Sequence, residues 1–291
     1  LAQSDECRLD DRSRALIPFG ERLSLAMQER GPLCVGIDPH PSLLGQWGLR
    51  DDPSGLERFS LSAAEALAPV AAAVKPQSAF FERHGSKGIA VLERVIEICR
   101  EAGTQVILDV KRGDIGSTTQ AYAEAYLHPR SSLCVDAITA SPYLGFGSLQ
   151  PMIDLAREHG NGVFVLALTS NPEAAPVQRA KAASGTVAGE VLSQLKALNH
   201  STSSMGSFGA VVGATISKAD EDLAIGGPLL VPGVGAQGGT PADVRRIFAG
   251  ALDLVLPSSS REILGQGPDP AALAEAARRT AEDFATLATG D

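Results

Sequence analysis

Short apolar runs alternate with longer amphipathic segments along most of the chain. The apolar runs lack a strict two-residue alternation, which is typical of parallel strands covered on both faces. We interpret them as eight buried strands, which span Leu33–Asp38, Val70–Lys75, Gln105–Val110, Leu133–Thr139, Val163–Leu168, Gly209–Ala214, Leu229–Pro232 and Leu252–Leu256.

A helical segment follows each predicted strand, and one more precedes the first strand. The spacing of apolar residues predicts helices over Phe19–Glu29, Asp51–Leu67, Gly88–Glu101, Thr118–Leu127, Gly147–His159, Thr186–Asn199, Ser217–Leu223, Pro241–Phe248 and Pro270–Thr286. Eight strand-then-helix units predict an α/β fold, a (β/α)8 TIM barrel whose active site lies at the carboxyl ends of the strands. A doubly wound open sheet is the alternative.

The domain organisation expected from this pattern is simple. Residues 17–291 form one barrel domain, and residues 1–16, which are polar and rich in charge, form a flexible N-terminal segment. Two stretches, Ser170–Gly185 and Leu198–Ser207, are rich in Gly, Ser, Pro and other polar residues. We interpret both as loops within the domain.

Composition narrows the class of protein. Of 291 residues, 44% are hydrophobic and 20% charged, which is enough apolar material for a core. The net charge of −9 argues against general binding to nucleic acid or to anionic membranes, so an anionic ligand needs a local cluster of donors. No apolar run is long enough for a membrane span and no signal peptide is evident, so we expect a cytoplasmic protein.

Charged residues interrupt the apolar pattern at the end of the third strand, in the stretch D-V-K-R-G-D. Asp109 and Lys111 are two apart and therefore point to the same face, and Asp114 follows in a turn. Such a charge run is often only a solvated loop. However, Asp109 lies inside an apolar run, where an unpaired charge is costly, and Lys111 is its obvious partner.

Other strand ends also carry polar residues. Asp38 follows the first strand, Lys75 ends the second, Ser170 follows the fifth and Arg261 follows the eighth. Charges are costly to bury unless paired and cluster at functional sites, so we predict a catalytic site here. Ser170 is equally typical of a turn before a proline.

The glycine-rich turn Gly233–Gly239 follows the seventh strand and contains Gln237. We expect it to offer free backbone N–H groups and, with Arg261 from the next unit, to form a phosphate site of the kind found in barrels. Neither the four cysteines nor the five histidines show ligand spacing, so no metal site is expected.

An ordered set of motifs resembles the orotidine 5′-phosphate decarboxylase family. D-V-K-R-G-D-I-G-S-T (Asp109–Thr118) is similar to its D-x-K-x-x-D-I-x-x-T signature. Further matches are G-I-D-P-H (Gly36–His40), V-K-P-Q-S-A-F-F-E (Val74–Glu82), S-P-Y-L-G-F-G-S-L (Ser141–Leu149), T-S-N-P-E (Thr169–Glu173) and V-P-G-V-G-A-Q-G-G (Val231–Gly239). The resemblance covers about residues 17–287 and is greatest to the longer bacterial subtype, as in mycobacteria and other actinobacteria.

The resemblance implies a carboxy-lyase of pyrimidine biosynthesis that converts orotidine 5′-monophosphate (OMP) to UMP and CO2 without a cofactor or metal. It implies that Lys111 protonates C6 of the pyrimidine, that Asp109 and Asp114 flank it, and that Lys75 completes the charge network. It also implies a homodimer in which Asp114, Ile115 and Thr118 reach into the partner's site.

The same resemblance implies the residues that bind substrate. Asp38 and Lys75 would contact ribose hydroxyls, Ser170 the edge of the base, and Gln237 and Arg261 the phosphate. The chain departs from the family pattern at one place, because Ser260 stands where the pattern has glycine before the phosphate-binding arginine.

Two other functions are possible on this barrel. Metal-dependent sugar-phosphate decarboxylases and aldolases share the D-x-K-x-x-D signature. Proteins that resemble those enzymes have an acid at the end of the second strand, where it helps to hold magnesium. Lys75 stands there, and its charge would repel the metal. A non-catalytic nucleotide-phosphate-binding module is the other alternative, although Lys111 and both acids are present.

Overall fold

The computed structural model describes residues 17–182, 185–202, 204–216, 220–235 and 238–285. Its centre is a closed barrel of eight parallel strands in the order β1-β10-β9-β8-β5-β4-β3-β2. The strands are β1 (Cys34–Ile37), β2 (Ala73–Pro76), β3 (Gln105–Arg112), β4 (Ala137–Ala140), β5 (Gly162–Leu168), β8 (Phe208–Val212), β9 (Leu229–Pro232) and β10 (Val255–Ser259). All eight predicted strands are present, and the predicted (β/α)8 barrel is confirmed.

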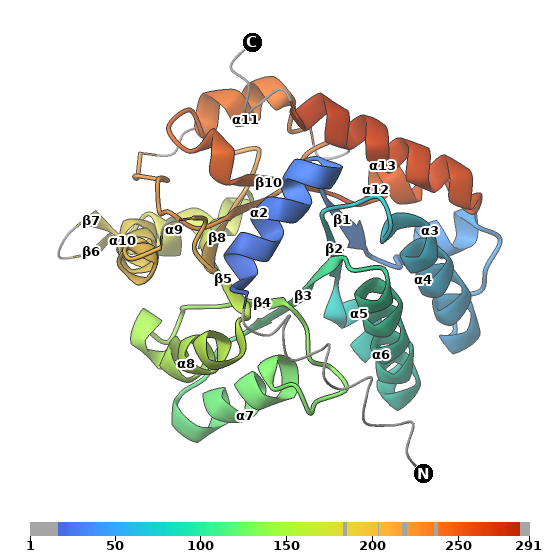
Figure 1. Cartoon of the computed structure of the whole chain (residues 1–291), viewed down its shortest axis with the longest axis horizontal. Coiled ribbons are helices and arrows are strands. Elements are labelled where there is room, and N and C mark those ends of the chain that lie inside the picture. Colours follow the sequence, from blue (N-terminus) through green and yellow to red (C-terminus); the bar gives the residue numbers. More distant parts are fainter. Residues whose placement is uncertain (1–16, 183–184, 203, 217–219, 236–237, 286–291) are drawn as a thin grey trace.

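Helices surround the barrel and cover the outer faces of its strands (Figure 1). They are α2 (Phe19–Arg30), α3 (Pro41–Gln46), α4 (Pro53–Leu67), α5 (Ser78–Glu82), α6 (Gly85–Glu101), α7 (Gly116–Leu127), α8 (Gln150–His159), α9 (Ala175–Gln178), α10 (Val187–Asn199), α11 (Pro241–Ile247), α12 (Arg261–Leu264) and α13 (Pro270–Ala285). Within the described ranges, none of them combines the length and apolarity needed to span a bilayer.

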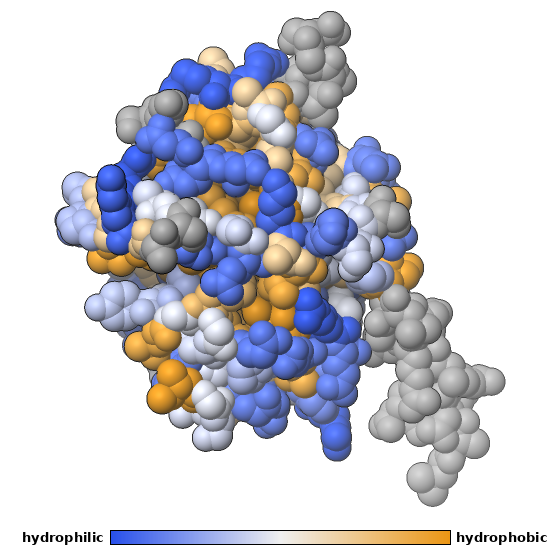
Figure 2. All heavy atoms as spheres, turned by 90° about the vertical axis from the view of Figure 1, so that its left-hand side faces the viewer, coloured by the Kyte–Doolittle hydropathy of each residue, from blue (hydrophilic) through white to orange (hydrophobic). Residues whose placement is uncertain are grey.

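The outer face over α9 and α10 carries mostly hydrophilic residues, with hydrophobic residues in smaller groups between them (Figure 2). The apolar side chains that hold the fold together lie beneath this surface, where the inner faces of the helices meet the strands. This is the division of surfaces that amphipathic helices on a buried sheet produce.

Helix α2 crosses the end of the barrel where the strands begin (Figure 1). Its Phe19 and Leu23 pack against the inner residues at the strand starts, and the ring of Phe19 meets that of Phe164 edge-on with centroids 5.9 Å apart. Arg22 fixes the helix in place by donating to Asp136 over 2.5 Å. This end of the barrel is therefore filled, and a ligand can enter only where the strands end.

The connection after β8 corrects one prediction. A helix was expected over Ser217–Leu223, but residues 220–223 are not helical, and residues 217–219 lie outside the described part. Gly226, Gly227 and Pro228 follow soon after its end, so a helix here would be short and could not extend.

The segment predicted as the loop Ser170–Gly185 contains some regular structure. It holds a 3-10 turn, η3 (Pro172–Ala174), the short helix α9, and a two-stranded antiparallel pair formed by β6 (Lys181–Ala182) and β7 (Gly185–Thr186). These elements are too short to produce an apolar period, and therefore the sequence pattern did not reveal them.

Asn199 ties the end of α10 to the barrel. Its side chain is 3% exposed, donates to the carbonyls of Phe208 (2.8 Å) and Ile225 (3.0 Å), and accepts from the N–H of Phe208. We expect Asn199→Ala to lower the free energy of unfolding by about 3 kcal/mol, because buried backbone groups lose their partners. Urea unfolding would measure this loss. The exposed Gln28→Ala is the control, and equal effects of the two substitutions would contradict the expectation.

Candidate active site

The third strand changes its pairing where its charged residues begin. Leu108 lies opposite Ile138 and Arg112 opposite Ala140, so β3 accommodates two more residues than β4 over this interval. Within this bulge Lys111 has a φ of 44°, and it is the one non-glycine residue of the described chain with a positive φ. Such strained backbone conformations often occur at functional sites, where they aim a side chain.

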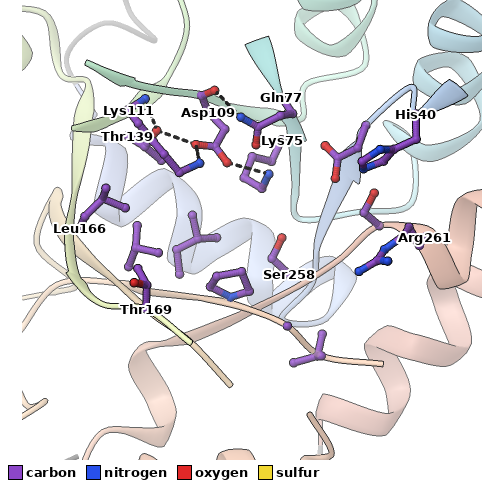
Figure 3. Close-up of a pocket in the computed structure, with 17 residues that line it drawn as sticks. His40, Lys75, Gln77, Asp109, Lys111, Thr139, Leu166, Thr169, Ser258 and Arg261 are labelled. Atoms are coloured by element: carbon purple, nitrogen blue, oxygen red, sulfur yellow. Dashed lines mark hydrogen bonds and ion pairs between the residues drawn. The ribbon is translucent and has the colours of Figure 1, made fainter. Parts of the chain in front are cut away.

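The side chains of β2 and β3 form a charge network around Asp109 (Figure 3). Lys75 Nζ lies 3.1 Å from Asp109 Oδ2, and Lys111 Nζ lies 2.6 Å from Asp109 Oδ1. The side chains of Lys75 and Asp109 are 7% and 8% exposed, whereas that of Lys111 is 46% exposed. One acid is thus shared between two amines, both of which line the cavity, and Lys111 is the more exposed of the two.

Both buried members of this network are held in their charged forms. Burial alone would raise the pKa of Asp109, but the charges of Lys75 and Lys111 outweigh it and hold that pKa well below its usual range. Burial would likewise lower the pKa of Lys75, but Asp109 and then Asp38 raise it above its usual value. Two cations therefore face one firmly ionised carboxylate.

A cavity of about 420 Å³ opens above the network, where the strands end. Polar or charged side chains from several strand ends line it: Asp38, His40, Lys75, Gln77, Asp109, Lys111, Thr139, Thr169, Ser258, Ser260 and Arg261. The rest of the lining consists of Leu166, Val211, Leu230, Pro232, Gly233 and Val234. Its size and its mixture of apolar surface with a few convergent polar groups are typical of small-molecule sites.

Arg261 lies at the far side of the cavity from Lys111 (Figure 3). It is the first residue of α12, and its guanidinium forms no ion pair with any described side chain. Because an arginine fork matches phosphate and carboxylate geometry, this end of the cavity suits an anionic group.

The glycine turn beside Arg261 differs from the sequence prediction. The backbone N–H groups of Gly235, Gly238 and Gly239 donate to carbonyls within the turn, so these three are not free to bind a phosphate. Tight turns satisfy their own donors in this way. Among the described residues at this end of the cavity, Arg261 is therefore the group best suited to hold an anion.

The structure brings five of the predicted site residues together around one cavity, and these are Asp38, Lys75, Asp109, Lys111 and Arg261. Gln237 and the N-terminal segment 1–16 lie outside the described residues. Ser170 is exposed, lies beyond the end of β5 and is not among the residues that line the cavity.

Asp114, Ile115 and Thr118 do not line the cavity of their own chain. Asp114 is half-buried and accepts a hydrogen bond from the N–H of Ile115 over 2.8 Å. Ile115 is 62% exposed, and Thr118 is exposed on the first turn of α7. All three residues lie at or just before the start of α7, away from the cavity of their own chain.

Gln77, His40 and Thr139 are among the cavity residues to which the sequence gave no role. Gln77 donates to the carbonyl of Asp109 over 3.2 Å, and Thr139 donates to Asp109 Oδ1. The ring of His40 contacts that of Phe80 in a tilted arrangement, with centroids 4.2 Å apart. A polar residue at the end of the apolar fourth strand was the one available signal for Thr139, and it did not show what the hydroxyl would touch.

No group of three or more His, Cys, Asp or Glu side chains able to hold a metal ion occurs among the described residues. Within the cavity, Asp109 already binds two amines. A closed β/α barrel with a charge network and an arginine suited to an anion at its strand ends is typical of an enzyme of the (β/α)8 class that acts on a small anionic molecule.

Known proteins narrow this class to one family. Residues 31–277 match the Orotidine 5′-phosphate decarboxylase / HUMPS family. The chain is 64% identical over 259 residues to the orotidine 5′-phosphate decarboxylase of Nocardioides sp., covering 87% of this chain and 94% of that protein.

Solved structures that resemble this chain indicate the same family. A Streptomyces avermitilis protein whose crystal structure is described as that of an orotidine 5′-phosphate decarboxylase has a TM-score of 0.92 and 56% identity over 94% of this chain and 97% of its own. The Leishmania donovani OMP decarboxylase has a TM-score of 0.70 and 31% identity, covering 93% and 98% of the two chains. The chain belongs to the orotidine 5′-phosphate decarboxylase family, and the resemblance found in its motifs is confirmed.

Proposed function

We propose that this protein converts orotidine 5′-monophosphate to UMP and CO2. The observation that carries the proposal is the network in which Asp109, ionised and buried, holds the amine of Lys111 at the wall of a cavity that ends in Arg261. A substrate with a reacting carboxylate at one end and a phosphate at the other matches this distribution of charge.

In the proposed reaction the bond between C6 and the carboxyl carbon breaks, and its electron pair remains on C6 as CO2 leaves. Lys111 stabilises this developing charge and then donates a proton from Nζ to C6, which completes UMP. The amine of Lys111 is then reprotonated from solvent. Asp109 on one side, Asp114 on the other and Lys75 behind hold the amine in place.

The remaining predicted residues bind the parts of the substrate that do not react. We assign ribose hydroxyls to Asp38 and Lys75, the edge of the base to Ser170, and the phosphate to Arg261 and Gln237. In support, Asp38 Oδ1 is buried without a hydrogen-bond partner in the described structure, so a ribose hydroxyl would satisfy it. No metal or cofactor takes part in this scheme.

We propose that two chains share each site, with Asp114, Ile115 and Thr118 reaching the partner's cavity. Large apolar side chains are exposed near the strand ends of the barrel, where Ile115 is 62%, Tyr143 79% and Leu144 53% exposed. Exposed apolar residues from two neighbouring connections suit a surface that a second copy covers.

Mixing two inactive variants would test the shared site. Lys111→Ala and Asp114→Asn should each be inactive alone, because each lacks one group of every site. Random exchange of subunits should restore about a quarter of all sites, since half of the dimers are mixed and each mixed dimer has one intact site. Recovery of activity on mixing, measured with OMP, is the expected result. No recovery under conditions where subunits exchange would mean that Asp114 acts in its own chain.

The alternative function is a metal-dependent decarboxylation or aldol cleavage of a sugar phosphate. We expect the loss of OMP absorbance to continue unchanged in EDTA, because Lys75 stands where such an enzyme needs a metal-binding acid. Hexulose and pentulose phosphates with Mg²⁺ serve as control substrates. The proposed function would be overturned if the folded protein did not decarboxylate OMP but turned over a sugar phosphate only with Mg²⁺.

A further inference from the structure

Thr139 lies on β4 opposite the bulge in β3, and its hydroxyl bonds to Asp109 and to Lys111 of that strand (Figure 3). The backbone N–H of Lys111 donates to Thr139 Oγ1 over 2.9 Å, and Oγ1 donates to Asp109 Oδ1 over 2.8 Å. A hydroxyl has one proton, and the N–H can only donate, so the direction of both bonds is fixed.

These bonds close a ring that begins and ends on Lys111. The ring runs from the N–H of Lys111 to Thr139 Oγ1, from there to Asp109 Oδ1, and from that oxygen to Lys111 Nζ over 2.6 Å. The amine is thereby fixed relative to its own backbone. Thr139 is 1% exposed, so water does not compete for its hydroxyl, and its β-branched side chain has little rotational freedom.

The ring also accounts for the strained backbone. Lys111 holds a left-handed conformation that costs a side-chain-bearing residue about 1 kcal/mol. In a regular parallel ladder its N–H would bond to a carbonyl of β4, but here it bonds to a side chain. Pairing resumes at Arg112, whose carbonyl accepts from the N–H of Ser141 over 2.8 Å. Thr139 thus supplies the partner that the bulge removes from the ladder.

We infer that Thr139 is a positioning residue for the decarboxylation, an inference that rests on the proposed function. Its hydroxyl holds Lys111 in the left-handed turn and orients the Asp109 carboxylate, so that the amine points to where C6 would lie. It acts through these two residues and not on the substrate.

Two substitutions separate the hydroxyl from the methyl group of Thr139. Thr139→Val keeps the shape and removes the hydroxyl, and it should lower kcat roughly 10- to 100-fold with KM nearly unchanged, because the amine loses its alignment. Thr139→Ser keeps the hydroxyl and should retain kcat within about 3-fold. If Thr139 only filled space, the valine variant would be the active one and the serine variant the impaired one.

Thr104→Val is the matched control at the opposite end of the barrel. Thr104 is also buried, donates to the carbonyl of Ala68 and accepts from Arg30. Its substitution removes a similar pair of hydrogen bonds and should lower stability without lowering kcat. A fall in kcat equal to that of Thr139→Val would show that general loss of stability explains both, and the inference would fail.

A crystal structure of Thr139→Val provides a readout that does not depend on activity. We expect Lys111 to leave the left-handed region or its bond to Asp109 to break, and unchanged geometry at both would overturn the inference. If the valine variant does not fold, Thr139→Ala replaces it with the same expected result. An inactive parent protein would contradict the proposed function, whereas an active parent with a fully active valine variant would contradict only the role of Thr139.

Discussion

Replacing Lys111 by alanine should lower kcat for OMP roughly 10⁴-fold, because the reaction loses both its proton donor and a cation beside the charge that develops at C6. Lys75 cannot substitute, since its amine is paired with Asp109 Oδ2 and only 7% of its side chain is exposed. The decrease in OMP absorbance measures the rate.

Lys111→Gly is the companion variant, because the backbone at this position has a φ of 44°. Glycine adopts this conformation without strain, so the glycine variant should be more stable than the alanine variant by about 1 kcal/mol in urea unfolding. Both should be equally inactive. Activity in either folded variant would show that Lys111 does not donate the proton.

Replacing Arg261 by alanine should lower kcat/KM for OMP roughly 10²-fold to 10³-fold, because charge-assisted hydrogen bonds to the phosphate are lost. The guanidinium forms no ion pair with the described side chains, so its removal leaves no protein charge unpaired there. Folding should therefore be unaffected, and unfolding curves should coincide with those of the parent protein.

The nucleoside orotidine, which lacks the phosphate, is the control substrate for Arg261. Its slow decarboxylation should be nearly the same in the parent protein and in Arg261→Ala, because the arginine has nothing to bind. An equal loss with both substrates would mean that Arg261 supports the fold of the site and does not hold the phosphate. Arg278→Ala, on the exposed side of α13, is the matched control for loss of one positive charge.

Several features of this protein could be predicted from its sequence. The eight apolar runs identified every barrel strand, because strands covered on both faces must be apolar throughout. Asp109 and Lys111 were predicted to pair, since a buried acid needs a partner, and they do. The ordered motifs also indicated the family, which the comparisons confirm.

Other features depended on contacts between distant segments. The helix expected over Ser217–Leu223 is absent from the described residues 220–223, and the glycine turn uses its own N–H groups. The occupied N–H groups of the turn do not follow from local pattern, because they depend on which hydrogen bonds the folded structure satisfies.

The sequence by itself therefore determined the barrel and the charged residues at the strand ends, because these follow from local apolar periodicity and from the cost of burying charge. Its ordered motifs indicated the family. Only the tertiary structure decided how the amine is aimed. The bulge in β3, the left-handed turn at Lys111 and the hydroxyl of Thr139 that bonds to it come from strands about thirty residues apart. Their pairing depends on barrel closure, which no short stretch of sequence encodes.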